Sequence, residues 1–325
     1  MSLTVWANHE LRPGARELFY DSLARLGCRV LQSPASSPAV LAEGKSDPGL
    51  AEADIAYGQP HPRDVVAHAR LRWVAVSTAG YTRYDTDEFR AAMRARGTVV
   101  TNASSVFAGP CAEHALSMML SFTRELPRYI VNKTGAREWN YEGGRYSIET
   151  LQGKTVIVLG YGAIGQRLTE LLTPFRCRVI GVRRQPRGDE GIEMVRDAEV
   201  GSILALADHV VNCLPDAPGT RRFCDAVFFS QMRRGAHFYN IGRGSTVDQD
   251  ALLRALQGGQ VGGAFLDALT PEPLPPEHPL WAEPRCQITP HLAGGHRGQD
   301  ESLVRHFTGN VQRFISGLPL LDRVI

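Results

Sequence analysis

Short apolar runs alternate with segments of helical periodicity through the first hundred residues. Apolar side chains recur at helical spacing over residues 15–26, and Gly27 ends that segment. Helices are also expected before and between the last two strands, whereas residues 32–50, rich in Ser, Pro, Gly and Ala, predict a loop with at most one short helix. Runs of β-branched and aromatic residues predict strands at 4–7, 28–31, 55–57, 73–77 and 98–101. This alternation is typical of a parallel sheet with helices on its faces.

A second alternation begins at residue 155. Strands are predicted at 155–159, 178–182, 209–213, 236–240, 263–267 and 286–289. Helices are predicted after residue 165 and at 200–206, 227–232, 248–256 and 297–315. With 325 residues, the chain is long enough for two domains with separate cores.

The segment between the two alternations predicts one strong helix and one loop. The helix is expected at 110–127, with Pro110 near its first position, and it is apolar nearly all round. Such a helix is expected to be buried between domains or against another subunit. Residues 135–152, which include Trp139, predict a connecting loop.

Composition and charge exclude several classes of protein. A hydrophobic content of 43% and a net charge of +2 indicate an ordinary globular chain, not a partner of nucleic acid or of an anionic membrane. The six cysteines are scattered and contain no Cys-x-x-Cys pair, so we expect no metal site or disulfide framework. No signal peptide is indicated at the N-terminus, and no apolar run approaches the roughly 20 residues of a membrane helix. We therefore expect a cytoplasmic protein.

The strand predicted at 155–159 runs into a Gly-x-Gly-x-x-Gly turn and then a helix, the order that dinucleotide binding requires. Gly160 permits the tight turn, Gly162 lets the backbone approach a pyrophosphate, and Gly165 lets the helix pack against the strand. The phosphates would lie at the positive end of the helix. An ordinary glycine-rich turn is the alternative, but the strand before it and the helix after it favour a dinucleotide site.

The strand predicted at 178–182 ends in Arg183 and Arg184. NAD enzymes usually carry an acidic residue there, which binds the ribose 2′-hydroxyl. Guanidinium groups at this position would bind a 2′-phosphate bidentately. We therefore favour NADP(H), while NAD(H) stays possible and a solvated basic loop is the alternative reading.

Three later strands also end in residues suited to acid–base chemistry. Arg243 lies between two glycines and could clamp a substrate carboxylate, and Asp267 ends the strand predicted at 263–267. Glu272 and His291 follow in loops at the same expected edge of the sheet. A cation, an imidazole and a carboxylate that orients it are what reduction of a 2-oxoacid needs.

The order Gly-Tyr-Gly-Ala-Ile-Gly, Asn-Ile-Gly-Arg-Gly, Phe-Leu-Asp with Glu272-Pro, and Thr-Pro-His resembles the D-isomer-specific 2-hydroxyacid dehydrogenase family over nearly the whole chain. The resemblance implies a Rossmann nucleotide-binding domain, residues 102–291, inserted into a flavodoxin-like substrate-binding domain formed by residues 1–101 and 292–325. Both would be doubly wound parallel-sheet α/β domains. It also implies a homodimer with the helix from Pro110 at the interface. The arginine-rich strand end is similar to that of glyoxylate/hydroxypyruvate reductases, which prefer NADPH.

The same resemblance implies roles for individual residues. Arg243 would bind the carboxylate of a small 2-oxoacid, His291 would exchange a proton with the carbonyl oxygen, and Glu272 would favour the protonated imidazole. The turn Ala79-Gly80-Tyr81 would hold the carboxylate through backbone N–H groups, although Tyr81 departs from the small or aliphatic residue usual there. Asp267 would hold the nicotinamide carboxamide. The expected cofactor-binding residues are Gly160, Tyr161, Gly162, Ala163, Ile164, Gly165, Arg183, Arg184, Leu214, Pro215, Thr220, Ile241, Gly242 and Asp267.

Other functions on the same fold stay open at this stage. One is a dinucleotide-sensing corepressor, although such proteins usually carry disordered extensions that we do not expect here. Another is a dehydrogenase for phosphoglycerate, formate or phosphite. Phosphoglycerate dehydrogenases often add a C-terminal regulatory domain, which we do not expect after Ile325. The identity of the 2-hydroxyacid cannot be read from the loops.

Overall fold

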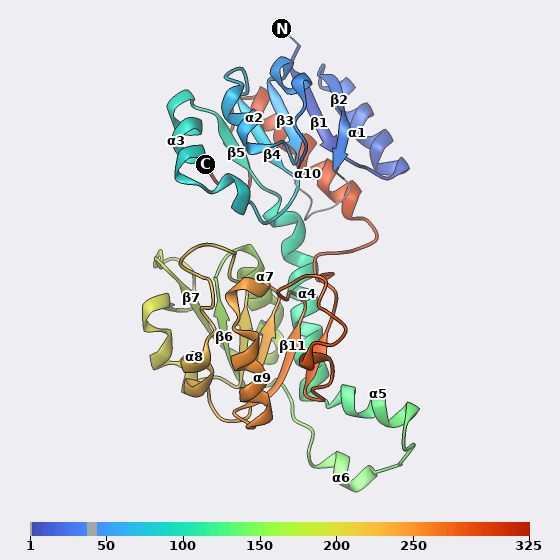
Figure 1. Ribbon diagram of the computed structural model, residues 1–325, viewed down its shortest axis with the longest axis vertical. Helices are drawn as coiled ribbons and strands as arrows, with labels where there is room; N and C mark the ends of the chain where they lie inside the picture. Colours follow the sequence, from blue (N-terminus) through green and yellow to red (C-terminus); the bar gives the residue numbers. More distant parts are fainter. Residues whose placement is uncertain (1, 38–43) are drawn as a thin grey trace. The chain divides into compact units, whose positions relative to one another are not determined.

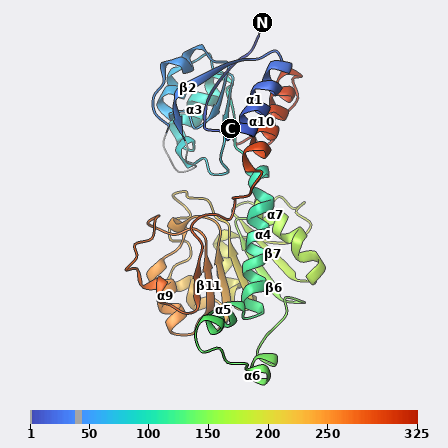
Figure 2. The same ribbon diagram turned by 90° about the vertical axis from the view of Figure 1, so that its right-hand side faces the viewer.

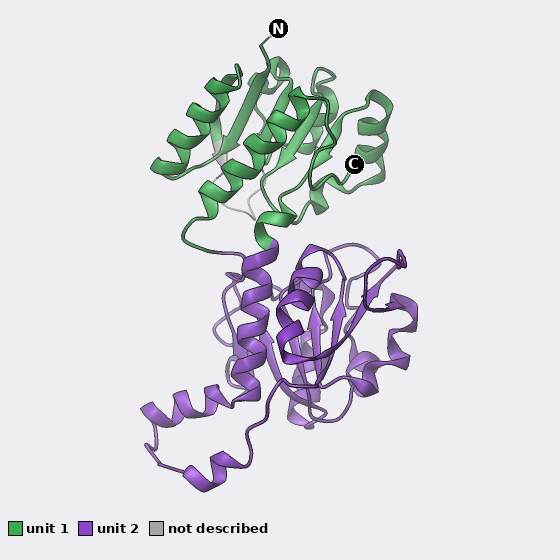
Figure 3. Ribbon diagram, turned by 180° about the vertical axis from the view of Figure 1, so that it is seen from behind, with its two compact units in different colours: residues 1–107, 296–325 green, residues 108–295 purple. Residues whose placement is uncertain are grey.

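The computed structural model describes residues 2–37 and 44–325. The chain divides into two compact units, Met1–Phe107 with His296–Ile325 (unit 1) and Ala108–Gly295 (unit 2), coloured separately in Figure 3. The domain boundaries expected from the sequence, at 101/102 and 291/292, lie a few residues from these divisions. The assignment of one unit to the substrate and the other to the cofactor stays a prediction.

Unit 1 contains a parallel sheet with the strand order β2-β1-β3-β4-β5. This is the flavodoxin-like order, in which the chain winds first to one side of the first strand and then to the other. The register pairs Val5 with Val30 and with Ile55. The strands are β1 (Thr4–His9), β2 (Arg29–Ser37), β3 (Ile55–Gly58), β4 (Trp73–Val76) and β5 (Val99–Thr101).

Helices from both ends of the chain complete the core of unit 1. Successive side chains of a strand point to opposite faces of the sheet. The face that carries Tyr57 and Trp73 is covered by α1 (Pro13–Arg25) and α10 (Gln299–Ile315). These two helices lie side by side in Figures 1 and 2. The Phe307 ring of α10 stacks on Tyr57 at 4.1 Å and on Trp73 at 5.3 Å between centroids. The other face is covered by α2 (Pro62–Ala67) and α3 (Asp87–Arg96). Residues 296–325 therefore belong to the same core as the N-terminal strands.

Unit 2 contains a parallel sheet with the strand order β12-β11-β10-β9-β6-β7-β8, and neighbouring strands all pair in parallel. This is the Rossmann order 3-2-1-4-5-6, read from β8, with β12 added at the far edge. The topological switch point lies between β6 and β9. The strands are β6 (Thr155–Leu159), β7 (Arg178–Arg183), β8 (Glu193–Arg196), β9 (His209–Asn212), β10 (Ala236–Asn240), β11 (Val261–Leu266) and β12 (Cys286–Ile288).

The two faces of this sheet pack against different helices. One face forms a core with α8 (Ala226–Gln231) and α9 (Gln249–Gln257), in which Phe228 and Leu252 are buried. On the other face lies α4 (Ser104–Thr123), whose Phe122 ring contacts Phe265 at 5.8 Å and Tyr239 at 6.0 Å. The helix α7 (Ala163–Leu172) follows β6 directly.

Both predictions on the segment between the alternations need correction, and one helix there was not predicted. The helix α4 begins at Ser104 and ends at Thr123, so Pro110 lies inside it and not near its first position. Burial of the apolar surface of α4 outweighs the backbone hydrogen bond that Pro110 cannot donate. The expected loop 135–152 contains a helix, α6 (Tyr141–Arg145), and it follows another unpredicted helix, α5 (Leu126–Thr134). Both belong to an arm that projects from the body of unit 2 (Figure 3).

Other local predictions also need correction. The strand β2 continues to Ser37, into the predicted loop, because its backbone pairs with the buried strand β1; residues 38–43 of that loop lie outside the described residues. Instead of a helix at 200–206, the chain forms 3₁₀ turns at Asp197–Ser202 and Leu204–Leu206. The strand β8 was not predicted because it is a half-exposed edge strand without an apolar run. A 3₁₀ turn at Pro48–Glu52 matches the one short helix allowed there.

Candidate active site

The chemistry predicted for unit 2 gathers at the carboxyl edge of its sheet. In a parallel sheet the carboxyl ends of all strands lie at one edge, where doubly wound proteins bind their ligands. The glycine turn follows β6, Arg243 follows β10, Asp267 follows β11 and His291 follows β12.

The glycine turn has the geometry that a dinucleotide requires. Gly160 has a φ of +81°, and a Cβ there would lie 3.0 Å from the backbone of Cys213. A Cβ on Gly165 would lie 2.9 Å from Cγ1 of Val158, so only glycine lets α7 pack this closely on β6. Gly162, in contrast, faces open space, and no side chain caps the first turn of α7. The backbone N–H groups of that turn are therefore available to a pyrophosphate, which fits the expected cofactor.

The loops after β6, β9 and β10 meet at Leu214. A Cβ on Gly242 would lie 2.6 Å from the carbonyl oxygen of Leu214, and Gly160 approaches the same backbone. The Thr220 hydroxyl donates to the carbonyl of Pro215 at 2.6 Å and closes the loop after β9. Predicted cofactor residues from distant parts of the sequence are thus neighbours, namely Gly160, Leu214, Pro215, Thr220, Ile241 and Gly242.

Three cofactor residues predicted beside the glycines lie at the start of α7. Ala163 and Ile164 form its first turn and are half-buried. Tyr161 is 4% exposed, and its ring lies 3.0 Å from the point where a Cβ of Gly181 would be. The Tyr161 ring is therefore part of the interior, and its backbone is the part that faces the turn.

The two arginines at the end of β7 differ in their surroundings. Arg183 contacts Glu190 at 3.4 Å between Nη1 and Oε1. Glu190 accepts hydrogen bonds from backbone N–H groups, first that of Arg187, which together with the Arg183 charge lower its pKa. Arg184 is exposed, and its Nη2 lies 3.4 Å from where a Cβ of Gly219 would be, in the loop after β9. Glu190 was missed from the sequence because it follows the strand by several residues, and it leaves Arg184 as the more available guanidinium.

His291 and Glu272 form a direct pair. Nδ1 of His291 lies 2.8 Å from Oε2 of Glu272, and the side chains are 27% and 24% exposed. Burial would raise the pKa of Glu272, but hydrogen bonds from His291 and from the backbone of Leu269 outweigh it and lower that pKa. An ionised carboxylate only accepts hydrogen bonds, so Nδ1 of His291 carries the proton between the two groups. Nε2 of His291 is then left for a ligand. The backbone of His291 has a φ of +50°.

Arg243 lies close enough to this pair for its charge to contribute to the lowered pKa of Glu272. Its Nη1 donates to the carbonyl of Gly242 at 2.8 Å. A Cβ on Gly244 would lie 2.0 Å from the backbone of Leu269, so the loops after β10 and β11 are pressed together at a glycine. The structure therefore brings Arg243, Glu272 and His291 into one neighbourhood.

A buried amide network, not predicted from the sequence, ties these loops together. Nδ2 of Asn212 donates to Oδ1 of Asn240 at 2.9 Å and to Oγ1 of Thr246 at 2.7 Å. Nδ2 of Asn240 in turn donates to the carbonyl of Ala268 at 2.8 Å, and Thr246 donates to the carbonyl of Arg243 at 2.7 Å. The sequence signal for this network is an asparagine at the end of each of the two apolar strands β9 and β10.

Asp267 is 2% exposed and anchors the loop that carries His291. Its Oδ1 accepts from the Thr289 hydroxyl at 2.7 Å and from the Leu292 N–H at 2.9 Å, and its Oδ2 accepts from the Ala293 N–H at 2.9 Å. Nε2 of His114, on α4, lies 3.2 Å from the same hydroxyl. The predicted contact of Asp267 with a nicotinamide stays a prediction, since its observed contacts are with the loop and with His114.

The remaining predicted residues, Ala79, Gly80 and Tyr81, lie in unit 1 directly after β4. The carbonyl of Ala79 accepts from Nδ2 of Asn102 at 2.7 Å, and that of Gly80 accepts from the Thr78 hydroxyl at 2.6 Å. The turn is held through its carbonyl groups, and its role in substrate binding stays a prediction.

The residues that the structure describes contain no group of three or more His, Cys, Asp or Glu side chains arranged to hold a metal ion. Within the same residues, no helix is long and apolar enough to cross a membrane. The expected cytoplasmic location is a separate prediction.

Comparison with known proteins agrees with this geometry. Residues 116–293 match the family model described as the D-isomer specific 2-hydroxyacid dehydrogenase NAD binding domain. The glyoxylate reductase/hydroxypyruvate reductase of Mus musculus is 35% identical over 232 residues, which cover 70% of this chain and 68% of that protein.

Two solved structures are similar over the full chain. The D-isomer specific 2-hydroxyacid dehydrogenase of Xanthobacter autotrophicus, in complex with NADPH and MES, is 26% identical with a TM-score of 0.81, covering 100% of this chain and 98% of that one. An NADPH-dependent glyoxylate/hydroxypyruvate reductase of Sinorhizobium meliloti, in complex with NADP and sulfate, is 26% identical with a TM-score of 0.75 at the same coverage.

We expect Asp267→Asn to destabilise unit 2 even without any ligand. The new amide would turn an N–H group toward a backbone N–H of the His291 loop, which costs about 1–3 kcal/mol in the free energy of unfolding. Urea denaturation followed by circular dichroism measures this. Glu277→Gln, the same charge change at an exposed position, is the control. Equal stability of the two variants would contradict the anchoring role.

Proposed function

Since this chain belongs to the D-isomer-specific 2-hydroxyacid dehydrogenase family, whose members are NAD(P)-dependent oxidoreductases, we propose that it reduces a small 2-oxoacid of the glyoxylate or hydroxypyruvate type to the D-2-hydroxyacid with NADPH. The observation that carries the proposal is the His291–Glu272 pair, with Arg243 beside it, at the edge that also bears the glycine turn. The mouse relative is named for both substrates, and the two similar structures hold NADPH or NADP.

The proposed roles follow from the charges and hydrogen bonds. The guanidinium of Arg243 binds the substrate carboxylate and polarises the neighbouring carbonyl. Nε2–H of the protonated His291 donates a proton to the carbonyl oxygen. A nicotinamide cofactor held at the glycine turn would supply the hydride for the carbonyl carbon. Glu272 holds Nδ1–H, which fixes the orientation of the ring and favours the imidazolium. Aligned donors of this kind contribute about 3–4 kcal/mol each to stabilising a developing oxyanion.

Cofactor preference is the first test of the proposal. The purified protein should reduce glyoxylate or hydroxypyruvate with a higher kcat/KM for NADPH than for NADH. Arg184→Gln should lower kcat/KM for NADPH by about tenfold, the cost of one charge-assisted contact to a phosphate, and leave that for NADH nearly unchanged. Equal use of both cofactors by the unaltered enzyme would refute the NADP(H) preference. Dinucleotide binding without turnover of any 2-oxoacid would favour a sensor.

Three variants, at His291, Arg243 and Glu272, should separate the proposed catalytic roles. His291→Ala should lower kcat by about 10²–10⁴-fold with little change in KM, the usual contribution of a general acid. Arg243→Ala should raise KM and lower kcat, because it removes the carboxylate partner and the polarising charge.

Glu272→Gln should change the pH profile in a defined direction. The lowered pKa of Glu272 keeps its carboxylate ionised at neutral pH, where it favours the protonated imidazole. Without that charge, the high-pH limb of the reduction should move down by about one pH unit. Glu277→Gln is again the control, and an unmoved limb in Glu272→Gln would remove the role assigned to it.

We also propose that the protein is a homodimer in which the arm of unit 2 contacts a second copy. Trp139 is 94% exposed, Val131 68% and Ile130 66%, so the arm displays apolar surface of the kind that marks interfaces. Sedimentation of the unaltered chain should give a dimer, and Ile130→Asp with Val131→Asp should give a monomer. Val227→Asp, at a position 61% exposed on α8, should leave the dimer intact. A monomer before any substitution would refute the proposal.

A further inference from the structure

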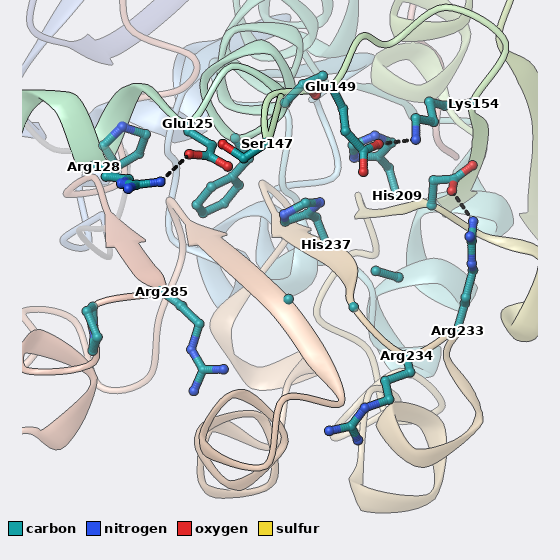
Figure 4. Close-up of a pocket in the computed structure, with 18 residues that line it drawn as sticks. Glu125, Arg128, Ser147, Glu149, Lys154, His209, Arg233, Arg234, His237 and Arg285 are labelled. Carbon is teal, nitrogen blue, oxygen red and sulfur yellow. Dashed lines mark hydrogen bonds and ion pairs between the residues drawn. The ribbon is translucent and has the colours of Figure 1, made fainter. Parts of the chain in front are cut away.

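A cavity of about 550 Å³ lies in unit 2 at the amino edge of its sheet (Figure 4). Part of its lining comes from residues that precede strands: Lys154 before β6, Asp208 before β9, Arg234 near the start of β10, and Arg285 before β12. The end of α4, the start of α5 and the segment after α6 supply much of the rest. The glycine turn and His291 lie at the opposite edge, about 15 Å away along strands that rise about 3.3 Å per residue. This basal cavity is therefore distinct from the candidate active site.

Most of the charges around the basal cavity are already paired. Arg128 binds Glu125 at 3.0 Å, Lys154 binds Glu149, and Arg233 binds Asp208, pairs that are dashed in Figure 4. Within the described residues, no carboxylate forms an ion pair with Arg234. It donates from Nη2 to the carbonyl of Gly258 at 3.2 Å.

Arg234 and Arg285, from different loops, both approach Gly259. Nη2 of Arg234 lies 3.3 Å, and Nη1 of Arg285 3.9 Å, from the position that a Cβ of Gly259 would take. Nε of Arg285 binds Oε1 of the buried Glu283 at 3.1 Å, so this carboxylate offsets part of its charge. Because a terminal nitrogen of each arginine lies near the same position, one polyvalent oxyanion can contact both guanidiniums. Their arrangement is that of a clamp for an oxyanion.

Aromatic rings line the wall of the cavity above this clamp. The His237 ring stacks on Phe122 at 5.1 Å and on His209 at 5.5 Å between centroids. Burial lowers the pKa of both imidazoles, that of His209 to about 3, so they are neutral at physiological pH. The wall thus offers flat, largely apolar surface to the organic part of a ligand, while the guanidiniums supply the charge.

We propose that the basal cavity binds a small polyvalent oxyanion, an organic phosphate or a polycarboxylate, between Arg234 and Arg285. The oxygens accept hydrogen bonds from both guanidiniums and balance their positive charge. The carbon skeleton lies against His237 and Phe122. The cavity volume is in the range of small-molecule sites and exceeds what an inorganic ion fills.

Calorimetric titration of the whole protein at low ionic strength tests this, with inorganic pyrophosphate and citrate as probes. One series of titrations contains saturating NADPH, so that the glycine turn and Arg184 are occupied, and a matched series contains none. We expect one equivalent of probe to bind per chain. Arg234→Gln and Arg285→Gln should each weaken it about tenfold, the loss of a charge-assisted contact, and the double variant should abolish it. Arg167→Gln, an exposed arginine on α7 outside the cavity, should bind as the unaltered chain does.

The outcomes separate the possible sources of the anion. Binding of pyrophosphate alone identifies a phosphate site, and binding of citrate alone a polycarboxylate site. Binding that NADPH abolishes, that survives in the double variant, or that is absent for both probes would overturn the proposal. If a glutamine variant does not fold, Arg234→Lys keeps the charge but removes the paired N–H donors of the guanidinium, and it should still weaken binding severalfold. Activity with 2-oxoacids plays no part in this readout, so the result is independent of the proposed reaction.

Discussion

The parallel direction of the strands in unit 2, secured by the buried amides of Asn212 and Asn240, is the constraint on which the candidate active site depends. Parallel pairing brings the ends of β6, β9, β10, β11 and β12 to one edge, although they are far apart in the sequence. The Asn212–Asn240–Thr246 network then joins the loops that leave β9, β10 and β11. Such buried amides are costly unless every group is paired, so the network permits few alternative arrangements of these loops. It positions Arg243 directly, while Asp267 holds the loop that carries His291.

Much of the architecture could be predicted from local patterns. The apolar runs identified nearly all the strands, and the glycine spacing at 160–165 identified the turn after β6, because these features depend on neighbouring residues alone. The family of the chain was also recognised from its motifs, in agreement with the comparisons. The extension of β2, the edge strand β8 and the arm helices depend on pairing or contacts made elsewhere in the chain. A pattern of adjacent residues does not contain that information.

The same distinction holds for the site. The pairing of Glu272 with His291 agrees with what the motif order implied, but the loop anchored by Asp267 and the contact of Glu190 with Arg183 were not foreseen. Each of the latter joins residues whose proximity is set by a loop path. The two edges of the sheet in unit 2 also carry different groups. The acid–base pair lies at the carboxyl edge, and the guanidiniums of Arg234 and Arg285 lie at the amino edge. One scaffold therefore presents two chemically different surfaces.

The place of α10 in unit 1 has a consequence for synthesis on the ribosome. The strands of unit 1 emerge before unit 2, yet the face that carries Tyr57 and Trp73 is covered only when Phe307 has been made. The whole of unit 2 is translated in the meantime, with its sheet continuous in sequence, and domains generally fold as units while the chain is being made. The sheet of unit 1 is thus made before unit 2 but covered after it, and it must be kept from aggregating until α10 has emerged.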